Sequence, residues 1–291
     1  MLFEEFVGSV YLPYVQQRKR SWKIDLSLLT NHLLPAFGRI ELDDIDAGGL
    51  AQFQTNKLRE GYERSSINRM TVLMKFIINS SMRWKHRERD RYWSEDAKEL
   101  PVLKNRERFL SVEEADRLIA VCRNSGSPIA AHLIILLLLT GARKGELLNA
   151  KWDYLDLVSR TILVPVSKSN KARYLYLSPD ALGIIRSLRN ISGQIHMFSP
   201  KNGKRPITNL QRVWEDIRKK AHLADCRLHD LRHSYASFLI SGGRSLFEVQ
   251  RLLGHADAKT TLRYAHLASE QLIEAASTVS EKVGRIHLGP E

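Results

Sequence analysis

The sequence lacks a cysteine framework, a long apolar run and an excess of acidic residues, and each absence excludes a class of protein. Its two cysteines, Cys122 and Cys226, are too few and too far apart for a disulfide scaffold or a cysteine-based zinc site. The longest apolar run, Leu133 to Leu139, is far too short to span a bilayer. No basic region followed by a hydrophobic segment and a cleavage site opens the chain. We therefore expect a cytoplasmic protein with two ordinary thiols and no membrane partner.

The charge balance is strongly basic. The chain has 45 lysines and arginines against 32 aspartates and glutamates, which gives a formal net charge of +13. Such an excess repels itself unless it meets a polyanion, and nucleic acid is favoured over a membrane surface because no span is predicted. The composition is otherwise globular, with 43% hydrophobic and 26% charged residues. A length of 291 residues exceeds the usual size of one domain, so two domains are expected.

Residues 1–88 are expected to form a small helical domain. Helices are predicted from Phe3 to Val15 with an interruption at Pro13, from Lys23 to Leu33, from Leu50 to Glu60, and from Ser65 or Ser66 to Lys85. Their basic faces suit a domain that clamps DNA. The next segment, 89–108, is dense in charge and lacks apolar periodicity. We expect it to be a linker, either a solvated surface segment or a basic strap along DNA phosphates.

The second domain is expected over residues 109–291. Ser111 and Glu114 form a capping-box signature that predicts a helix to about Cys122. Pro128 begins a helix that ends at Gly141, and because IAAHLIILLLL is hydrophobic all round, this helix should lie at the centre of the core. Core packing would then hold Arg143 rigidly just past the end of the helix.

A short β-hairpin is predicted within this helical domain. β-Branched and aromatic residues favour strands from Arg160 to Val166 and from Arg173 to Leu177, joined by a turn that carries Lys168. Further helices are predicted at Glu146 to Trp152, Ser178 to Leu188, Asn209 to Ala221 and Ser269 to Val283. The expected fold class is therefore mainly α (α+β), two helical domains with a small β-sheet or hairpin in the second.

The stretch from Leu228 to His266 gathers side chains suited to chemistry on a phosphate. His229 and Arg232 are three residues apart, so on a helix beginning near Leu228 both would project from the same face and could grip a phosphate. His255 closes the apolar run from Leu246 to Leu253, and Tyr264 follows nine residues later. One short loop could bring His255 and Tyr264 together.

The pattern HDLRH, then LLGH, then a tyrosine nine residues on resembles the tyrosine recombinase (phage integrase) family. TGARKGELL, from Thr140 to Leu148, resembles the family's first arginine motif, and Lys168 stands where the family has its hairpin lysine. The resemblance covers roughly Phe109 to Ala275. It implies a core-binding domain followed by a catalytic domain of the DNA-breaking-rejoining type, with no cofactor or metal.

The resemblance also implies a function and partners. The function is site-specific recombination that integrates or excises DNA, with duplex attachment or recombination sites as substrate and the nucleoid as its place of action. Phage integration, mobile-element transfer and chromosome resolution are all open as the biological role. Four protomers would exchange strands through a Holliday junction, with accessory directionality proteins as further partners. The helix expected from Ser269 to Val283 is a candidate to dock on a neighbouring protomer.

Breaking and rejoining a phosphodiester without an energy cofactor requires a covalent intermediate that stores the ester bond, and a phenol can form one. Tyr264 is the expected nucleophile, and the resemblance implies a 3′-phosphotyrosyl link with a free 5′-hydroxyl. Arg143 and Arg232 would stabilise the negative charge on the nonbridging oxygens, and His255 would add a donor to them.

Three further residues have expected roles that the sequence leaves partly open. His229 would accept the phenol proton or orient the phosphate. Lys168 would protonate the leaving 5′-oxygen, an assignment that rests chiefly on the resemblance because Lys171 lies nearby. Glu146 would hold Arg143 or His229 in place, or form a simple helix salt bridge.

Three rival interpretations are weaker. His229 and His233 mimic the two-histidine spacing of the HExxH zinc motif, but aspartate replaces the glutamate and no third ligand is evident, so His233 is interpreted as structural. A noncatalytic DNA-binding module would explain the charge but has no need of a nucleophile. A type IB topoisomerase would share the chemistry, although the compact amino-terminal domain and the segment after Tyr264 favour a recombinase.

Overall fold

The computed structural model describes residues 1–87, 93–102, 108–165, 172–203, 205–255 and 257–268. The chain divides into two compact units, Met1–Asn105 and Arg106–Glu291, and each has a hydrophobic core of its own. Within the described residues no helix combines the length and apolarity needed to cross a membrane.

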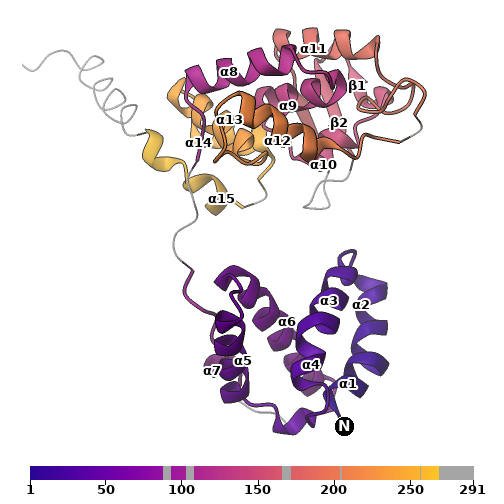
Figure 1. Ribbon diagram of the computed structural model, residues 1–291, viewed down its shortest axis with the longest axis vertical. Helices are drawn as coiled ribbons and strands as arrows, with labels where there is room; N and C mark the ends of the chain where they lie inside the picture. The colour runs from indigo at the N-terminus through magenta and orange to yellow at the C-terminus, as the bar shows by residue number, and fades with distance from the viewer. Residues whose placement is uncertain (88–92, 103–107, 166–171, 204, 256, 269–291) are drawn as a thin grey trace, which may run out of the picture. The chain divides into compact units, whose positions relative to one another are not determined.

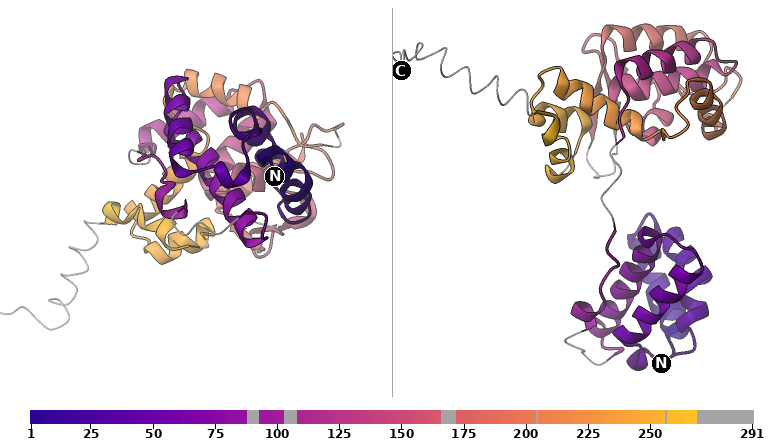
Figure 2. Two further views of the ribbon diagram at one scale, coloured as in Figure 1. Left: turned by 90° about the horizontal axis from the view of Figure 1, so that it is seen from below. Right: turned by 60° about the vertical axis from the view of Figure 1, so that its left-hand side comes forward.

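The first unit is built of helices that pack side by side (Figure 2). Its elements are α1 (Phe3–Phe6), η1 (Val7–Tyr11), α2 (Leu12–Arg18), α3 (Trp22–Leu28), η2 (Leu29–Leu33), α4 (Leu34–Phe37), η3 (Leu42–Asp44), α5 (Ala47–Arg59), α6 (Arg64–Arg83) and α7 (Trp93–Asp96). The positions of the predicted helices are confirmed, and Gly61, with a φ of 85°, follows the end of α5.

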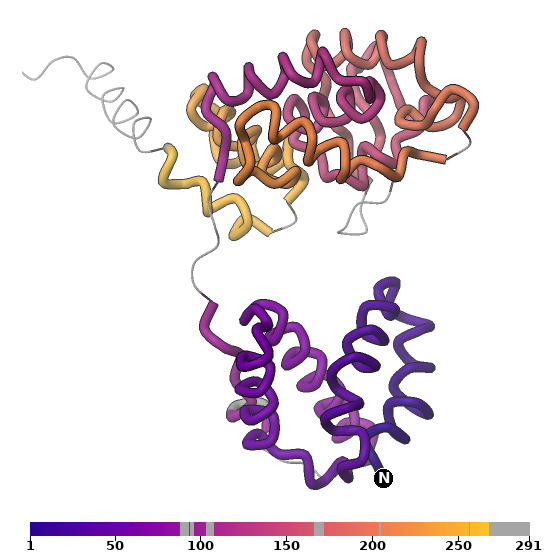
Figure 3. The backbone as a smooth tube through the Cα atoms, in the orientation of Figure 1, coloured from indigo at the N-terminus to yellow at the C-terminus, as the bar shows by residue number. Residues whose placement is uncertain are grey.

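The helix that begins at Phe3 does not stop at Pro13. The segment η1 is π-helical, and the amide of Leu12 donates to the carbonyl of Val7, five residues back. The same arrangement precedes Pro35, where the amide of Leu34 donates to the carbonyl of Leu29. A proline lacks an amide hydrogen and its ring crowds the carbonyl four residues earlier, and the wider π turn relieves that crowding. The chain therefore continues as one coil (Figure 3), and the predicted interruption is wrong.

The core of the first unit extends past the residue where the linker was expected to begin. Trp93 is 1% exposed and belongs to this core, together with Ala97. The side chain of Gln54 donates to the carbonyl of Lys98 at 2.9 Å, and Asn68 pairs with both backbone groups of Leu100 at 2.8 Å. Trp93 is the large aromatic residue that anchors this charged segment in the core. A single buried residue produces no apolar periodicity, so the sequence pattern does not reveal it. The division of the chain falls after Asn105, inside the segment 89–108.

The second unit is organised around α9 (Pro128–Thr140), which contacts α8 (Val112–Arg123), α11 (Pro179–Arg189), α12 (Leu210–Lys220) and α13 (Asp230–Ser241) (Figure 1). Leu133, Ile134 and Leu136 of α9 are fully buried, which confirms the prediction of a central apolar helix. The capping box of α8 is also confirmed, because the Ser111 hydroxyl accepts from the amide of Glu114.

A three-stranded antiparallel sheet has the strand order β1-β2-β3. The strands are β1 (Leu155–Asp156), β2 (Thr161–Val164) and β3 (Arg173–Tyr176), and Leu163 pairs with Tyr174 across the hairpin. The hairpin is confirmed, while β1 was missed because two residues carry no detectable alternation. The turn expected at 167–172, with Lys168 and Lys171, lies almost wholly outside the described residues, as does the helix expected from Ser269 to Val283.

The remaining elements are short. They are α10 (Lys144–Leu148), η4 (Trp152–Tyr154), α14 (Leu246–Leu253), α15 (Lys259–Leu262) and η5 (Ala265–Ala268). A separate apolar cluster of Ala236, Ile240, Val249, Leu253 and Tyr264 joins α13, α14 and the segment after α15. Over the part of the chain that the structure describes, the fold is mostly helical with a small three-stranded sheet, which confirms the predicted fold class.

Candidate active site

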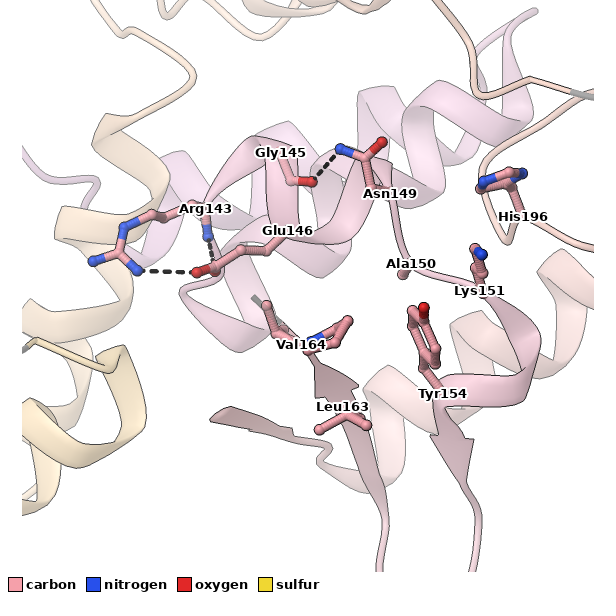
Figure 4. A pocket seen from close by; sticks show the side chains of 11 residues that line it. Arg143, Gly145, Glu146, Asn149, Ala150, Lys151, Tyr154, Leu163, Val164 and His196 are labelled. Atoms are coloured by element: carbon pink, nitrogen blue, oxygen red, sulfur yellow. Dashed lines mark hydrogen bonds and ion pairs between the residues drawn. The ribbon is translucent and has the colours of Figure 1, made fainter. Parts of the chain in front are cut away.

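Arg143 is positioned by the end of α9 and the start of α10. Gly141 ends α9 in the left-handed conformation, with a φ of 60°, and turns the chain toward α10. Arg143 then serves as the N-cap residue of α10, and its amide donates to Glu146 Oε2 at 2.8 Å. Its guanidinium, which is 27% exposed, donates to Glu146 Oε1 at 2.9 Å (Figure 4). The buried helix thus delivers a charged group to the surface of its unit.

Glu146 bridges two arginines. Its side chain is 7% exposed and also accepts from Nη2 of Arg173 at 2.6 Å and from Nε of Arg173 at 3.2 Å. Burial alone would raise the pKa of Glu146, but the hydrogen bonds and charge of Arg173, with those of Arg143, outweigh burial and hold the pKa below its ordinary value. Glu146 therefore holds Arg143, as one of its predicted alternatives has it, and it also holds Arg173 at the start of β3.

Arg173 connects the hairpin to the end of α14. Its Nη1 donates to the carbonyl of Leu252 at 3.0 Å. A β-carbon added at Gly254, where φ is 65°, would stand 2.5 Å from Cδ of Arg173. Glycine at position 254 therefore has two roles. It ends α14 in the left-handed conformation, and its lack of a side chain leaves room for Arg173.

Arg232 is almost fully buried, with 4% of its surface exposed. Its guanidinium donates to the carbonyl of Gly141, the residue that caps α9, at 2.5 Å, and to the carbonyl of Leu253, the last residue of α14, at 2.7 Å. Burial, followed by the charges of Arg143 and Arg173, lowers the pKa of Arg232 to about 10. It stays charged at neutral pH, and two helix ends fix its orientation.

Two histidines of the HDLRH motif lie beside each other at the start of α13. His229 is the N-cap residue of α13, so it stands just outside the helix that was expected to include it. The rings of His229 and His233 meet edge to face, with centroids 5.1 Å apart. Partial burial, then the charge of Arg232, lowers the pKa of His229, while burial and the neighbouring His229 lower the pKa of His233 to about 4. Both imidazoles are uncharged at neutral pH.

His255 follows the left-handed Gly254 at the end of α14. Its Nδ1 lies 2.8 Å from the hydroxyl of Thr261, and its backbone amide donates to the carbonyl of Gln250 at 3.1 Å. Burial, followed by the charges of Arg232 and Arg143, lowers the pKa of His255 to about 4. The imidazole is therefore neutral and is held on the α15 side by Thr261.

Tyr264 lies between α15 and η5 and is 5% exposed. Its hydroxyl lies 2.5 Å from Nδ1 of His233. Burial raises the pKa of Tyr264, and the charges of Arg263 and Arg232 oppose this rise without cancelling it. The phenol is therefore protonated at neutral pH and needs a base before it can act as a nucleophile.

Two cavities border Arg143 and Arg232. One of about 520 Å³ lies between α10 and the hairpin and is lined by Arg143, Glu146, Lys151 and His196, among others (Figure 4). A second, of about 420 Å³, is lined by His229, Arg232, Lys144, Arg218 and Arg227, among others. Both cavities are lined by cationic side chains, which are the groups that bind a phosphate in proteins.

The arrangement suits displacement at a phosphodiester. The charges of Arg232, Arg143 and Arg173 all lower the pKa of His255, so these three charges act together at one place. Fixed guanidinium groups stabilise the charge that develops on nonbridging oxygens. Among the described residues no group of three or more His, Cys, Asp or Glu side chains is suited to hold a metal ion.

The structure brings most of the predicted site residues together. Arg143, Glu146, His229, Arg232, His255 and Tyr264 lie within one network of contacts and charges. Lys168 lies outside the described residues. Sequence reasoning missed Arg173, which looked like an ordinary strand residue, and it interpreted His233 as structural. The four-residue spacing of His229 and His233 was the available signal that both histidines share a helix face.

Comparisons with known proteins are consistent with this geometry. The model of the phage integrase family matches residues 108–271. Tyrosine recombinase XerC of Alcanivorax borkumensis is 33% identical over 177 residues, which are 57% of this chain and 57% of that protein. The integrase of Salmonella phage P22 is 29% identical over 64% of this chain and 50% of its own length. The chain therefore spans only about half the length of these two relatives.

One relative and one solved structure match over a greater length. Tyrosine recombinase XerD of Haemophilus influenzae is 27% identical over 87% of this chain and 88% of its own length. A lambda integrase dimer bound to a COC′ core site has a TM-score of 0.74 and 16% identity, and the match covers 100% of this chain and 99% of that one. At that identity the solved structure supports the fold alone.

Proposed function

The chain belongs to the phage integrase family, and from this premise we propose that it is a site-specific tyrosine recombinase. It cleaves and rejoins duplex DNA through a 3′-phosphotyrosyl intermediate. The observation that supports this function best is the buried Tyr264 hydroxyl, bonded to an uncharged imidazole and within reach of the charges of Arg232 and Arg263.

In this proposal the phosphodiester binds between Arg143 and Arg232. The two guanidinium groups come from different helix ends, so they approach the nonbridging oxygens from two directions. Neither has to reorganise as charge develops, because Glu146 holds the first and two backbone carbonyls hold the second. His255 supplies a further donor from its Nε2 side, since its Nδ1 faces Thr261.

The reaction conserves the energy of the bond that it breaks. The Tyr264 oxygen attacks phosphorus, the bond to the 5′-oxygen breaks, and Lys168 gives that oxygen a proton. A 5′-hydroxyl from a second strand then attacks the phosphotyrosine and reverses the step. This is why no energy cofactor is required.

The partners are proposed from the relatives. One structural neighbour is a lambda integrase tetramer bound to a Holliday junction, with a TM-score of 0.71 and 17% identity. We propose that this chain likewise acts as a tetramer on two duplex recombination sites, with accessory directionality proteins as further partners and with the segment 269–283 docking on a neighbouring protomer. Activity of this kind places the protein with the nucleoid DNA.

A nicked suicide duplex tests the proposal. The site is first selected from a pool of random duplexes by binding to the wild-type protein, and a nick beside the cleavage position then lets the released fragment diffuse away. Wild type is expected to give a covalent protein–DNA band on a denaturing gel, and Tyr264→Phe to give none. Tyr176→Phe is the matched control, because Tyr176 is 54% exposed on β3, away from the site contacts described above.

Each result of this assay has a clear meaning. A band with wild type and with the Tyr176 variant, but not with Tyr264→Phe, supports the proposed reaction. If wild type binds the selected site and forms no covalent band, the chain is a DNA-binding module and the proposal fails. A band that persists in Tyr264→Phe assigns the nucleophile to another residue.

A further inference from the structure

The sequence offers His229 as a candidate to accept the phenol proton of Tyr264, but the geometry around Tyr264 singles out a different side chain. The hydroxyl lies 2.5 Å from Nδ1 of His233. The two rings are 5.9 Å apart between centroids and tilted by 53°. This distance is that of a short hydrogen bond between a phenol and a ring nitrogen. His233 is therefore in direct contact with the atom that reacts.

His229 is placed differently. It lies one turn earlier, at the N-cap of α13, and is exposed to solvent. Its ring meets the ring of His233, and its side chain also lines the cavity that contains Arg232. His229 is thus positioned to meet a phosphate from the solvent side, whereas the phenol contact belongs to His233.

The groups around His233 keep its ring uncharged. His229, Asp230 and Arg232 face it from α13, and Arg263 and Tyr264 face it from the segment after α15. Burial and the positive neighbours lower the pKa of His233 to about 4, and only Asp230 opposes them. In the neutral tautomer with its hydrogen on Nε2, the ring has a lone pair on Nδ1 that accepts the phenol hydrogen bond. A bound phosphodiester brings a negative charge into this cationic site, and that charge makes the ring a stronger base at the moment of reaction.

We propose that His233 is the general base for Tyr264 in strand cleavage and the general acid that returns the proton in rejoining. As the tyrosine oxygen bonds to phosphorus, its proton passes to Nδ1 of His233 while the leaving 5′-oxygen takes a proton from a different group. On rejoining, the imidazolium returns its proton to the departing phenolate, so protons and charge balance over the cycle. The assignment rests on the proposed function.

The test uses His233→Asn in the full chain. The asparagine side-chain oxygen can occupy the position of Nδ1 and accept the phenol hydrogen bond, but it cannot take the proton. The variant therefore keeps the positioning of Tyr264 and loses the base. His222→Asn is the matched control, because His222 is exposed and its φ of 56° suits asparagine. Site binding and the circular dichroism melting curve report whether each variant retains its fold. His233→Gln is measured in the same way as a second variant.

Single-turnover rates are measured on two suicide duplexes, one normal and one with sulfur in place of the leaving 5′-oxygen. A thiolate leaves without a proton, so a defect in the general acid is rescued by sulfur and a defect in the base is not. We expect His233→Asn to cleave both duplexes about 100-fold more slowly than wild type. We also expect its rate to rise steadily between pH 6 and 9, because solvent hydroxide must then remove the proton.

The outcomes separate this assignment from the proposed function. A covalent complex with wild type, together with a His233→Asn rate within about threefold of it, overturns the assignment and leaves the recombinase intact. Rescue of the variant by the sulfur duplex also overturns it, because His233 would then act on the leaving group. Absence of any wild-type complex on a bound site overturns the proposed function instead.

Discussion

Replacement of Glu146 by glutamine should weaken the second unit and misplace two arginines at once. In the wild type, the buried carboxylate accepts from Arg143 at 2.9 Å and from Arg173 at 2.6 and 3.2 Å. Glutamine keeps the shape but has no charge, and its amide nitrogen is a donor that faces guanidinium donors. The change therefore leaves Arg143 and Arg173 close together without a counterion.

The size of the effect follows from burial. Removing one partner of a buried ion pair costs about 3–5 kcal/mol, and the lower end applies because Arg143 is 27% exposed and the glutamine oxygen still accepts one bond. A loss of about 3 kcal/mol corresponds to a fall in Tm of about 6–12 °C for a domain of this size. Cleavage should fall as well, because Arg143 is no longer fixed against the phosphate.

Thermal unfolding by circular dichroism measures the first effect and the suicide duplex the second. Glu215→Gln is the matched control, because this glutamate of α12 is exposed and its carboxylate accepts a hydrogen bond from the side-chain amide of Gln211 at 3.2 Å. The control should change Tm by less than 2 °C, on the basis that surface substitutions alter stability by about 0.5 kcal/mol or less. A Glu146→Gln variant as stable as the control would refute the argument that this carboxylate holds the arginines together.

Three further predictions follow from the same geometry. Gly254→Ala should lose about 1 kcal/mol more stability than Gly243→Ala, since both glycines have positive φ but only the added carbon at Gly254 would meet Arg173; equal losses in urea unfolding would contradict this. Arg232→Lys should reduce single-turnover cleavage by about 10²–10³-fold with much less change in site binding, because a point charge cannot satisfy both helix-end carbonyls and still meet the phosphate, and a near-normal rate would contradict it. The Tm of the second unit should fall as pH drops from about 6.5 toward 4, because unfolded histidines take up protons near pH 6.5 while the pKa values of His233 and His255 in the fold are about 4. His255→Asn should reduce that slope and leave the part that His233 contributes, and an unchanged slope would exclude His255 as a source.

The helices were predictable where local chemistry decides them. The capping box at Ser111 and Glu114, the all-apolar run of α9 and the glycine at 141 each signal an element boundary within a few residues of sequence. The prediction at Pro13 was wrong because it assumed that a proline interrupts an α-helix. In the structure the helix continues through a π turn before Pro13, in which the amide of Leu12 donates to the carbonyl of Val7. The burial of Trp93 was not predicted, because a single aromatic residue in a charged segment gives no repeating apolar pattern.

The site was predictable in its parts but not in its connections. Spacing and the resemblance to a family's motifs predicted Arg143, Arg232, His255 and Tyr264 as site residues, whereas neither reveals contacts between elements far apart in the chain. Arg173 reaches Glu146 from 27 residues away and the carbonyl of Leu252 from 79 residues away. The pairing of His233 with Tyr264 spans 31 residues in the same manner. Such contacts arise from packing of the whole unit, and only the fold reveals them.

The central claim is that Tyr264 becomes covalently attached to DNA. Mass spectrometry of the trapped complex, after digestion of both protein and DNA, identifies the residue that carries the nucleotide and the end to which it is joined. We predict a 3′-phosphotyrosyl adduct on the peptide that contains Tyr264. An adduct on another residue, a 5′-linked adduct, or unmodified Tyr264 in a protein that binds its site would contradict the account.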